Sequence, residues 1–320
     1  MTKPKVLTIV GPTASGKTEI SIRAAEEIKL KSCKDVEIIS ADSRQVYKYI
    51  PIASAQPSKE QLKKFKHHFI ASLELDEEFN AGEFGKKGRA LVARIFENGK
   101  IPIIVGGSGL YISSLIYGLF DYDEPYSEHE LKQKQKIIRK KLYDELENKG
   151  LAKLFSELKK ADPQTADNMT HITERRVMRA LEVYYATGLP VSFHRRKKVD
   201  IGFEAVQIGI DLNRGELYKR INNRVDSMIE KGLIGEVKKL KTKGFHYTKY
   251  NSLNTVGIKE VFDYLDGLIS YERMAELIKQ NTRRFAKRQL TWFRRYKDIK
   301  WVSYDSIDLD TNTIIEGVMK

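Results

Sequence analysis

The sequence predicts an α/β fold, in which helices flank a parallel β-sheet, with a helical domain inserted into it. Short apolar runs at 5–10, 36–40 and 101–107 are bounded by turn residues, as buried strands are. Helical patterns separate these runs, and strands that alternate with helices are typical of a parallel sheet covered on both faces. Between 128 and 188 the pattern is helical and highly charged, with no evident buried strand, which predicts the insertion.

Each element follows from a local pattern. In the first predicted helix, Ile20, Ala24 and Ile28 recur at helical spacing, and a later helix ends at Gly99. The predicted strands are 5–10, 36–40, 67–73, 101–107 and 206–212. The predicted helices of the core are 18–30, 82–99 and a long basic helix within 271–301, which a short strand-like end follows.

The chain is expected to have three parts. Residues 1–120 form an α/β core, and the character of the sequence changes near Asp121. Residues 121–197 form a helical insertion domain. Residues 198–320 return to the core and end in a basic helical region, so the insertion interrupts one continuous domain.

The amino-acid composition indicates what kind of protein this is and what kind of partner it binds. The 320 residues are 41% hydrophobic, which favours a packed core, and the formal net charge is +14. Such an excess favours a nucleic-acid partner, although a generally basic surface is the simpler alternative. Cys33 is the only cysteine, which excludes an internal disulfide and fits a reducing compartment. With no membrane-spanning run and no signal peptide, a cytoplasmic protein without an obligate protein partner is expected.

The basic residues gather in three places. Arg175, Arg176 and Arg179 lie on one predicted helix of the insertion, residues 194–198 are strongly basic, and further Lys and Arg residues crowd 283–297. Each cluster alone could be a solvated helix face. Together they favour RNA, and the aromatic residues among them are expected to lie in the core.

A phosphate-binding loop follows the first predicted strand and precedes the first helix. The motif G-x-x-x-x-G-K-[ST] is filled by Gly11, Pro12, Thr13, Ala14, Ser15, Gly16, Lys17 and Thr18. Its glycines allow several backbone N–H groups to face one anion, and the helix adds its positive end. Lys17 supplies a point charge, and Thr18 is placed to bind Mg²⁺. The core is therefore predicted to be a P-loop fold.

Polar residues follow two other strands of the predicted sheet. Asp42 comes after 36–40, and Ser108 follows Gly106-Gly107 after the strand at 101–107. The carboxyl ends of parallel strands meet at one edge, so both should lie near Lys17 and Thr18. A carboxylate beside a diphosphate indicates a metal ion or a reacting proton. Alternatively, Asp42 simply caps a helix.

Five motifs together resemble the tRNA dimethylallyltransferase family. They are GPTASGKT at 11–18, SADSRQVY at 40–47, PIIVGGSGLYI at 102–112, RRVMRALEVYYATG at 175–188 and TRRFAKRQLTWFR at 282–294. They occur in the family's order and span nearly the whole chain. The resemblance implies transfer of a dimethylallyl group from dimethylallyl diphosphate to the N6 amine of the adenosine immediately 3′ of a tRNA anticodon.

The resemblance also implies roles for individual residues. Asp42 resembles the general base, and Arg224 resembles an arginine that clamps the diphosphate. Thr13, Lys17 and Thr18 resemble the diphosphate and Mg²⁺ contacts, and Ser108 stands where the family usually has Thr. The residues expected to contact the anticodon arm are Asp42, Ser43, Arg44, Gln45, Arg175, Arg176, Arg179, Lys259, Arg284 and Arg288.

At two places the residues differ from those usual in the family, and the sequence leaves two alternative functions open. Ile258 replaces a common Tyr in a segment expected to contact RNA. The stretch KHHF at 66–69 replaces a more usual Pro-His-His-Leu, and its His67 and His68 are expected to be structural. The same loop could serve a nucleoside or polynucleotide kinase that uses ATP. It could also belong to a non-catalytic RNA-binding module.

Overall fold

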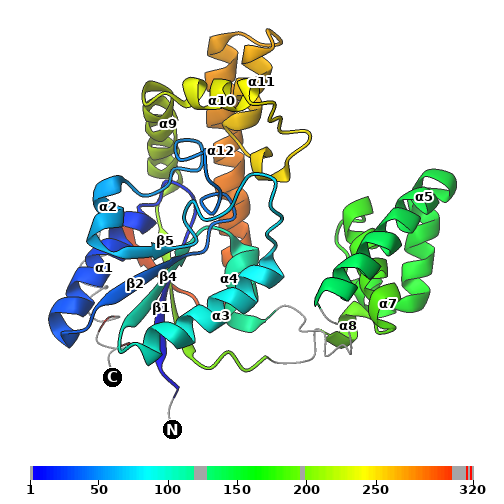
Figure 1. The fold of residues 1–320 in the computed structure, drawn as a ribbon, viewed down its shortest axis with the longest axis horizontal. Coiled ribbons are helices and arrows are strands. Elements are labelled where there is room, and N and C mark those ends of the chain that lie inside the picture. The colour runs from blue at the N-terminus through cyan, green and yellow to red at the C-terminus, as the bar shows by residue number, and fades with distance from the viewer. Residues whose placement is uncertain (1–2, 119–127, 195–198, 305–314, 316–317, 319–320) are drawn as a thin grey trace. The chain divides into compact units, whose positions relative to one another are not determined.

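The computed structural model describes residues 3–118, 128–194, 199–304, 315 and 318. The chain divides into two compact units (Figure 1). The first comprises Met1–Ile116 and Ile201–Lys320, and the second comprises Tyr117–Asp200. The first unit is therefore discontinuous in sequence, because the second is inserted into it.

The first unit is built on a parallel sheet, which confirms the predicted α/β fold. Within the described residues the sheet has six strands in the order β3-β2-β4-β1-β5-β6, all paired in parallel (Figure 1). The strands are β1 (Lys5–Val10), β2 (Val36–Ser40), β3 (Lys66–His68), β4 (Ile101–Gly106), β5 (Glu204–Asp211) and β6 (Lys300–Ser303).

One predicted strand, 67–73, is wrong over most of its length. Pairing with β2 ends at His68, and Phe69 and Ala71 have φ angles of 60° and 44°. A left-handed backbone cannot continue a strand, so the chain turns away from the sheet edge. Leu73 keeps only an isolated bridge to Tyr47.

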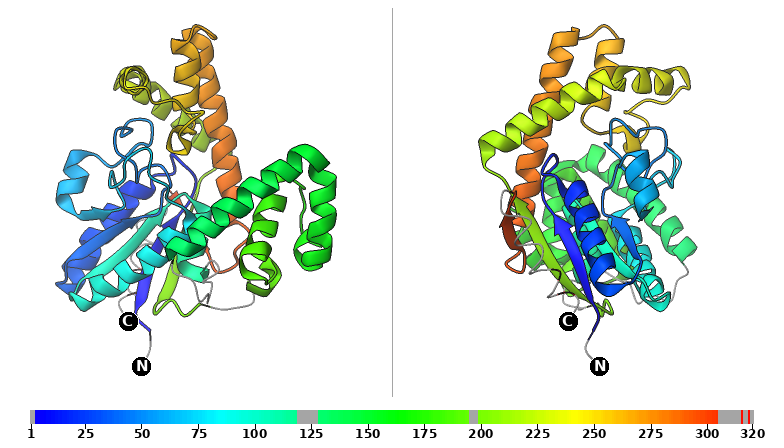
Figure 2. Two further views of the ribbon diagram at one scale, coloured as in Figure 1. Left: turned by 45° about the vertical axis from the view of Figure 1, so that its right-hand side comes forward. Right: turned by 90° about the vertical axis from the view of Figure 1, so that its left-hand side faces the viewer.

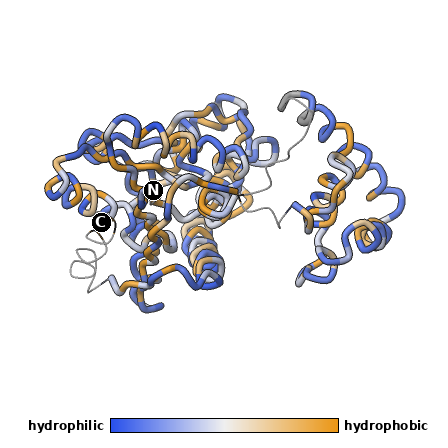
Figure 3. The backbone as a smooth tube through the Cα atoms, turned by 90° about the horizontal axis from the view of Figure 1, so that it is seen from below, coloured by the Kyte–Doolittle hydropathy of each residue, from blue (hydrophilic) through white to orange (hydrophobic). Residues whose placement is uncertain are grey.

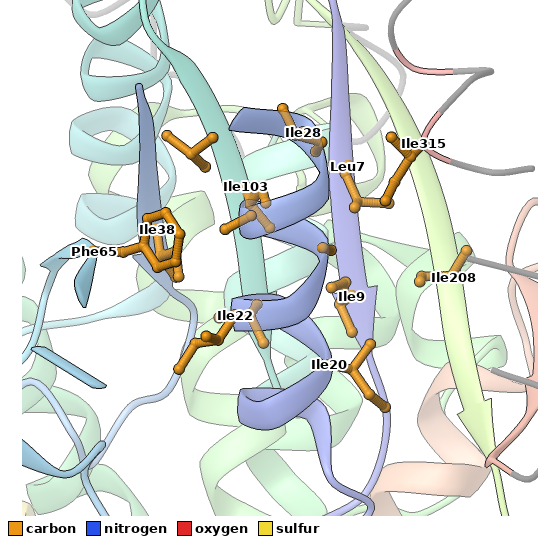
Figure 4. Close-up of a cluster of buried hydrophobic side chains, with 14 of the residues drawn as sticks. Leu7, Ile9, Ile20, Ile22, Ile28, Ile38, Phe65, Ile103, Ile208 and Ile315 are labelled. Atoms are coloured by element: carbon orange, nitrogen blue, oxygen red, sulfur yellow. The ribbon is translucent and has the colours of Figure 1, made fainter. Parts of the chain in front are cut away.

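Helices cover both faces of the sheet because the connections run in opposite directions from its middle. Helix α1 (Lys17–Ser32) lies on one face, and α3 (Ala81–Glu97) and α4 (Gly109–Tyr117) lie on the other (Figures 1 and 2). Under α1, its Ile20 and Ile28 pack against alternate strand residues such as Leu7, Ile9 and Ile103 (Figure 4). This apolar layer holds the first turn of α1 against the end of β1.

A helical group stands beyond the carboxyl ends of the strands. It contains α9 (Arg214–Glu230), α10 (Leu233–Thr242), α11 (Ile258–Leu265) and α12 (Tyr271–Phe293) (Figures 1 and 2). Its core includes Val225, Val237, Phe262 and Ile278, together with residues of the loop that follows β2. Short helical segments α2 (Lys59–Lys64) and η1 (Asn251–Leu253) complete this unit. The group therefore forms a wall beside the strand ends.

The second unit is helical in its described residues. It contains α5 (Glu128–Ala161), α6 (Pro163–Asp167), α7 (Glu174–Thr187) and α8 (Val191–His194). Helix α5 breaks at Gly150, whose φ is 75°, and both halves pack on α7 through Leu142, Leu158 and Leu181. Polar and apolar residues alternate along these helices (Figure 3), as expected for amphipathic helices around one small core.

In the part of the chain that the structure describes, no helix is both long enough and apolar enough to cross a membrane.

Candidate active site

A cavity of about 470 Å³ lies at the carboxyl ends of the strands. It brings together most of the residues that the sequence singles out. Those in its wall are Thr13, Lys17, Thr18, Asp42, Ser43, Arg44, Gln45, Ser108, Arg224, Lys259 and Arg288. They come from the loops after β1, β2 and β4 and from helices α1, α9, α11 and α12, so the fold concentrates polar groups at one edge of the sheet.

The phosphate loop leaves the start of α1 open for an anion. Gly16 is the N-cap residue with φ 85°, and no side chain caps the helix. A side chain at Gly16 would be strained by this φ, and its Cβ would come within 2.7 Å of the Tyr304 ring. The free N–H groups of the first turn are the donors that bind phosphates at helix N-termini.

A second cavity, of about 240 Å³, lies along the same loop. Ala14, Ser15 and Gly16 line it, and Lys17, Thr18 and Arg224 line both cavities. Lys17, Thr18 and Arg224 thus stand where the two cavities meet, together with Ala55 and Pro57. The hydroxyl of Ser15 is buried and has no hydrogen-bond partner among the described residues.

Two cations face the cavity from different elements. The Lys17 ammonium donates a hydrogen bond of 2.5 Å to the carbonyl of Pro12. Burial, and then the neighbouring Arg224 guanidinium, lower the pKa of Lys17 to about 7, and Asp42 opposes this shift. Burial also lowers the pKa of Arg224, again against Asp42. Two cations that destabilise each other are suited to hold an anion between them.

Asp42 uses one carboxylate oxygen to hold its own loop. Its Oδ1 accepts hydrogen bonds from the backbone N–H groups of Arg44 at 2.8 Å and Gln45 at 3.3 Å. In the described residues no hydrogen bond reaches Oδ2. The turn fixes the carboxylate, as the capping alternative expects, and leaves one oxygen for another partner.

Ser108 connects two strand ends. Its hydroxyl accepts from the Ser43 N–H at 2.9 Å and donates to the Ser43 hydroxyl at 3.3 Å. Its own N–H donates to the carbonyl of Ala41 at 3.2 Å. Gly106 permits this close approach, because a Cβ there would lie 2.2 Å from the Ala41 oxygen. Ser108 therefore holds the Asp42 loop beside β4.

Arg44 and Gln45 turn their polar ends into the protein. The Arg44 guanidinium donates to the carbonyls of Asn251 at 2.6 Å and Ser252 at 3.3 Å, and burial lowers its pKa. The Gln45 amide donates to the carbonyl of Ala55 at 2.9 Å and accepts from the Ser40 hydroxyl at 2.9 Å. Both side chains shape the cavity wall.

Helix α12 supplies wall residues that sequence reasoning missed. Gln289 is buried, and its amide accepts from the Thr13 N–H and donates to the Gly107 carbonyl, both at 2.8 Å. Phe285 was expected in the core but is 39% exposed and lines the cavity. A polar residue on the apolar side of a long helix was the available signal for Gln289.

Other predicted contacts lie outside this cavity. Arg284 is exposed on α12, and its guanidinium reaches the Asn281 side chain at 3.4 Å. Arg175, Arg176 and Arg179 are exposed on α7 of the helical unit, where Arg179 also pairs with Glu182 at 2.9 Å. Of the basic segment 194–198, residues 195–198 lie outside the described residues.

The structure accounts for two places where the sequence differs from the family. Ile258 serves packing, and Lys66 joins a group of ion pairs around Glu37. Ile258 is fully buried in the core of the helical group, so it serves packing. The His68 imidazole lies 2.6 Å from the Glu37 carboxylate, to which Lys66 contributes a weaker contact at 3.6 Å. His67 is different, because its ring lines the cavity and Nε2 has no hydrogen-bond partner in the described chain.

The chain is similar in sequence to known proteins of one family. Residues 45–296 match the family model "IPP transferase". The chain is 40% identical to a tRNA dimethylallyltransferase of Natranaerobius thermophilus, covering 100% of this chain and 92% of that protein. It is 42% identical to a tRNA dimethylallyltransferase of Carboxydothermus hydrogenoformans, covering 98% and 96% of the two chains.

Solved structures with the same fold carry related names. A tRNA isopentenylpyrophosphate transferase from Staphylococcus epidermidis is 37% identical with a TM-score of 0.68, and 99% of each chain is covered. A eukaryotic dimethylallyltransferase whose crystal structures show it acting on tRNA is 28% identical with a TM-score of 0.74. That likeness covers 94% of this chain and 74% of the other.

Proposed function

Because this chain belongs to the IPP transferase family, we propose that it transfers a dimethylallyl group from dimethylallyl diphosphate to the N6 amine of the adenosine immediately 3′ of the anticodon in tRNA. Diphosphate is the second product. The observation that carries the proposal is one cavity that holds Lys17, Arg224 and Asp42 together. Two cations suit a diphosphate leaving group, and a carboxylate suits the proton that the amine must lose.

The donor binds through its diphosphate. The N–H groups at the start of α1 receive the phosphate oxygens, with Lys17 and Arg224 on either side and Thr13 and Thr18 near them. As the bond between the allylic carbon and the diphosphate oxygen breaks, the electron pair leaves with the oxygen. The cations stabilise that charge because they are already in place and partly desolvated.

The acceptor loses its proton to Asp42. An aromatic amine is a weak nucleophile, so the new bond between N6 and the allylic carbon forms as the old carbon–oxygen bond breaks. The free Oδ2 of Asp42 takes the N6 proton, while Oδ1 stays fixed by the turn. Ser108 and Ser43 position this carboxylate through the hydrogen bonds between their loops.

We further propose that Mg²⁺ accompanies the diphosphate. In the described residues no group of three His, Cys, Asp or Glu side chains could hold a metal ion unaided. Mg²⁺ often binds through one or two protein oxygens together with substrate phosphates, and the Thr18 hydroxyl stands in the cavity wall for this role. The ion would neutralise charge on the departing diphosphate.

The RNA contacts are proposed for the exposed cations around the cavity. Lys259 and Arg288 stand in its wall, and Arg284 is exposed one turn from Arg288 on α12. The arginines of α7 provide a separate basic face on the helical unit. Arg44 and Gln45 act by shaping the wall, since their polar ends are already hydrogen-bonded. An enzyme of this kind would work in the cytoplasm with its tRNA.

The decisive test is product analysis. Unmodified tRNA is incubated with the protein and dimethylallyl diphosphate, digested, and its nucleosides are identified by mass. We expect N6-dimethylallyladenosine at the position 3′ of the anticodon, without ATP. Transfer that required ATP and phosphorylated a hydroxyl would support the kinase alternative, which the relatives do not favour. Binding without any product would support the non-catalytic module.

We expect tRNA affinity to fall steeply with salt. Each Lys or Arg that neutralises a phosphate contributes about 0.7 to 0.9 to the slope of log affinity against log salt. Replacing both Arg284 and Arg288 by Gln should make this slope less steep. The decrease should be about 0.7 to 0.9 for each phosphate contact that is lost. Filter binding from low to moderate salt measures the slope. Arg273→Gln is the matched control, because Arg273 lies on the same helix and pairs with Glu276 at 2.6 Å. An unchanged slope in the double variant would exclude both contacts.

Donor binding should take up a proton at pH 8. Lys17 has a pKa of about 7 in the free protein and is mostly neutral at pH 8, whereas a bound diphosphate raises that pKa. Uptake should approach one proton per donor, and affinity should weaken as pH rises above about 7, since protonating Lys17 then costs more. Calorimetry in buffers of different ionisation enthalpy measures the uptake.

Lys17→Arg is the control for this experiment. Arginine keeps its charge throughout this pH range, so the uptake should disappear while binding persists. Equal heats for the original protein in all buffers would show that Lys17 is already charged before the donor arrives.

A further inference from the structure

An aromatic ring is exposed in the cavity wall, which polar and apolar side chains share. Phe285 is 39% exposed and lines the cavity, whereas Phe293, two turns later on α12, is 1% exposed and Ala286 is fully buried. The ring of Phe285 is therefore not enclosed by the core, unlike that of Phe293. An apolar ring left open beside a substrate cavity is suited to a flat ligand.

The position of Phe285 along α12 matches the expected place of the acceptor. Gln289 anchors the helix to the phosphate loop through Thr13, and Phe285 precedes Gln289 by four residues, about 6 Å along the axis. In the proposed reaction, the N6 atom attacks the carbon that leaves the diphosphate. The adenine ring therefore lies only a few bond lengths from the diphosphate. This distance is similar to the length of one helical turn, which separates Phe285 from Gln289.

A cation accompanies the ring. The Arg288 guanidinium lies 5.7 Å from the centroid of the Phe285 ring. A guanidinium would be unfavourable beside the allylic carbon, which gains positive character as the diphosphate leaves. It is favourable beside RNA, because every nucleotide brings a phosphate. The pair is therefore better suited to the acceptor than to the isoprenoid tail.

We propose that Phe285, oriented by Arg288, is the platform on which the adenine stacks after it leaves the anticodon loop. An enzyme that modifies a base must hold it outside the stack, and aromatic stacking is a usual means of doing so. This role rests on the proposed function and adds to it a residue that selects the acceptor. It predicts a contact between the Phe285 ring and the target base.

The test is a double-mutant cycle between protein and RNA. An anticodon stem-loop is compared with one that carries an abasic site at the target position, for the original protein and for Phe285→Leu. The original protein should bind the intact stem-loop about 5- to 150-fold more tightly, the range for one stacked base. Phe285→Leu should lose most of that preference, and Phe285→Trp should keep it.

A matched control and a donor measurement complete the experiment. Tyr271→Leu changes an aromatic on the same helix that is 43% exposed and lies outside the cavity wall, so it should keep the preference. An unchanged preference in Phe285→Leu would overturn the proposal. So would a changed KM for dimethylallyl diphosphate with an unchanged KM for the stem-loop, because the ring would then hold the isoprenoid tail. Failure of the proposed function is separate, since the unaltered protein would then form no modified nucleoside.

Discussion

Replacing Asp42 by Asn should reduce transfer by about 10² to 10⁴, the usual range for lost general base catalysis. Asparagine keeps an oxygen that can accept from the N–H groups of Arg44 and Gln45, so the turn should survive. The carboxylate oxygen that faces the amine is replaced by the NH₂ group of the side-chain amide, which cannot take the N6 proton.

Single-turnover transfer with pre-bound tRNA and donor measures this effect. The affinity for the donor should stay the same or increase, because the variant lacks the negative charge beside the diphosphate. Asp42→Ala is the companion variant, since it removes the turn as well as the base. Near-normal transfer by Asp42→Asn together with a damaged Asp42→Ala would assign Asp42 a purely structural role.

Replacing Arg224 by Met should reduce the rate of transfer by about 10² to 10³, as expected when one preorganised group for developing charge is removed. Methionine fills similar space without the charge, so the packing of α9 should persist. Donor binding should also weaken, since the diphosphate loses one of its two nearest cations. Transfer and donor affinity are measured on the same preparation.

This variant has a second readout that simple damage would not produce. Arg224 lowers the pKa of Lys17, so its removal should raise that pKa and reduce the proton uptake on donor binding. Lys219→Met is the control, because Lys219 is an exposed cation on α9. If uptake in Arg224→Met equals that of the original protein, the two cations do not interact.

The parts of the site that could be predicted from the sequence are local. The phosphate loop depends on residue types at fixed spacing, and the buried strands depend on short apolar runs, so Lys17 and Asp42 were placed at one sheet edge. The early end of β3 was not predicted from the run 67–73, because Phe69 and Ala71 adopt left-handed backbone angles that their residue types do not indicate.

The remaining parts depend on partners far away in the chain. Arg44 is directed by carbonyls 207 and 208 residues later, and no spacing rule connects them. Phe285 resembles its apolar neighbours in the helical pattern, and only the assembled cavity distinguishes it from Phe293. Periodicity describes one helix, whereas exposure depends on what packs beside it.

The Gln289 amide joins Thr13 and Gly107, which precede it by 276 and 182 residues. The donor site is therefore finished by a helix that leaves the ribosome long after the phosphate loop does. A nascent chain can fold its first strands and the phosphate loop early, but it lacks the side chain that braces the loop against β4. Contacts this distant in sequence form late and slowly. The growing chain should thus acquire donor binding only when synthesis has passed α12.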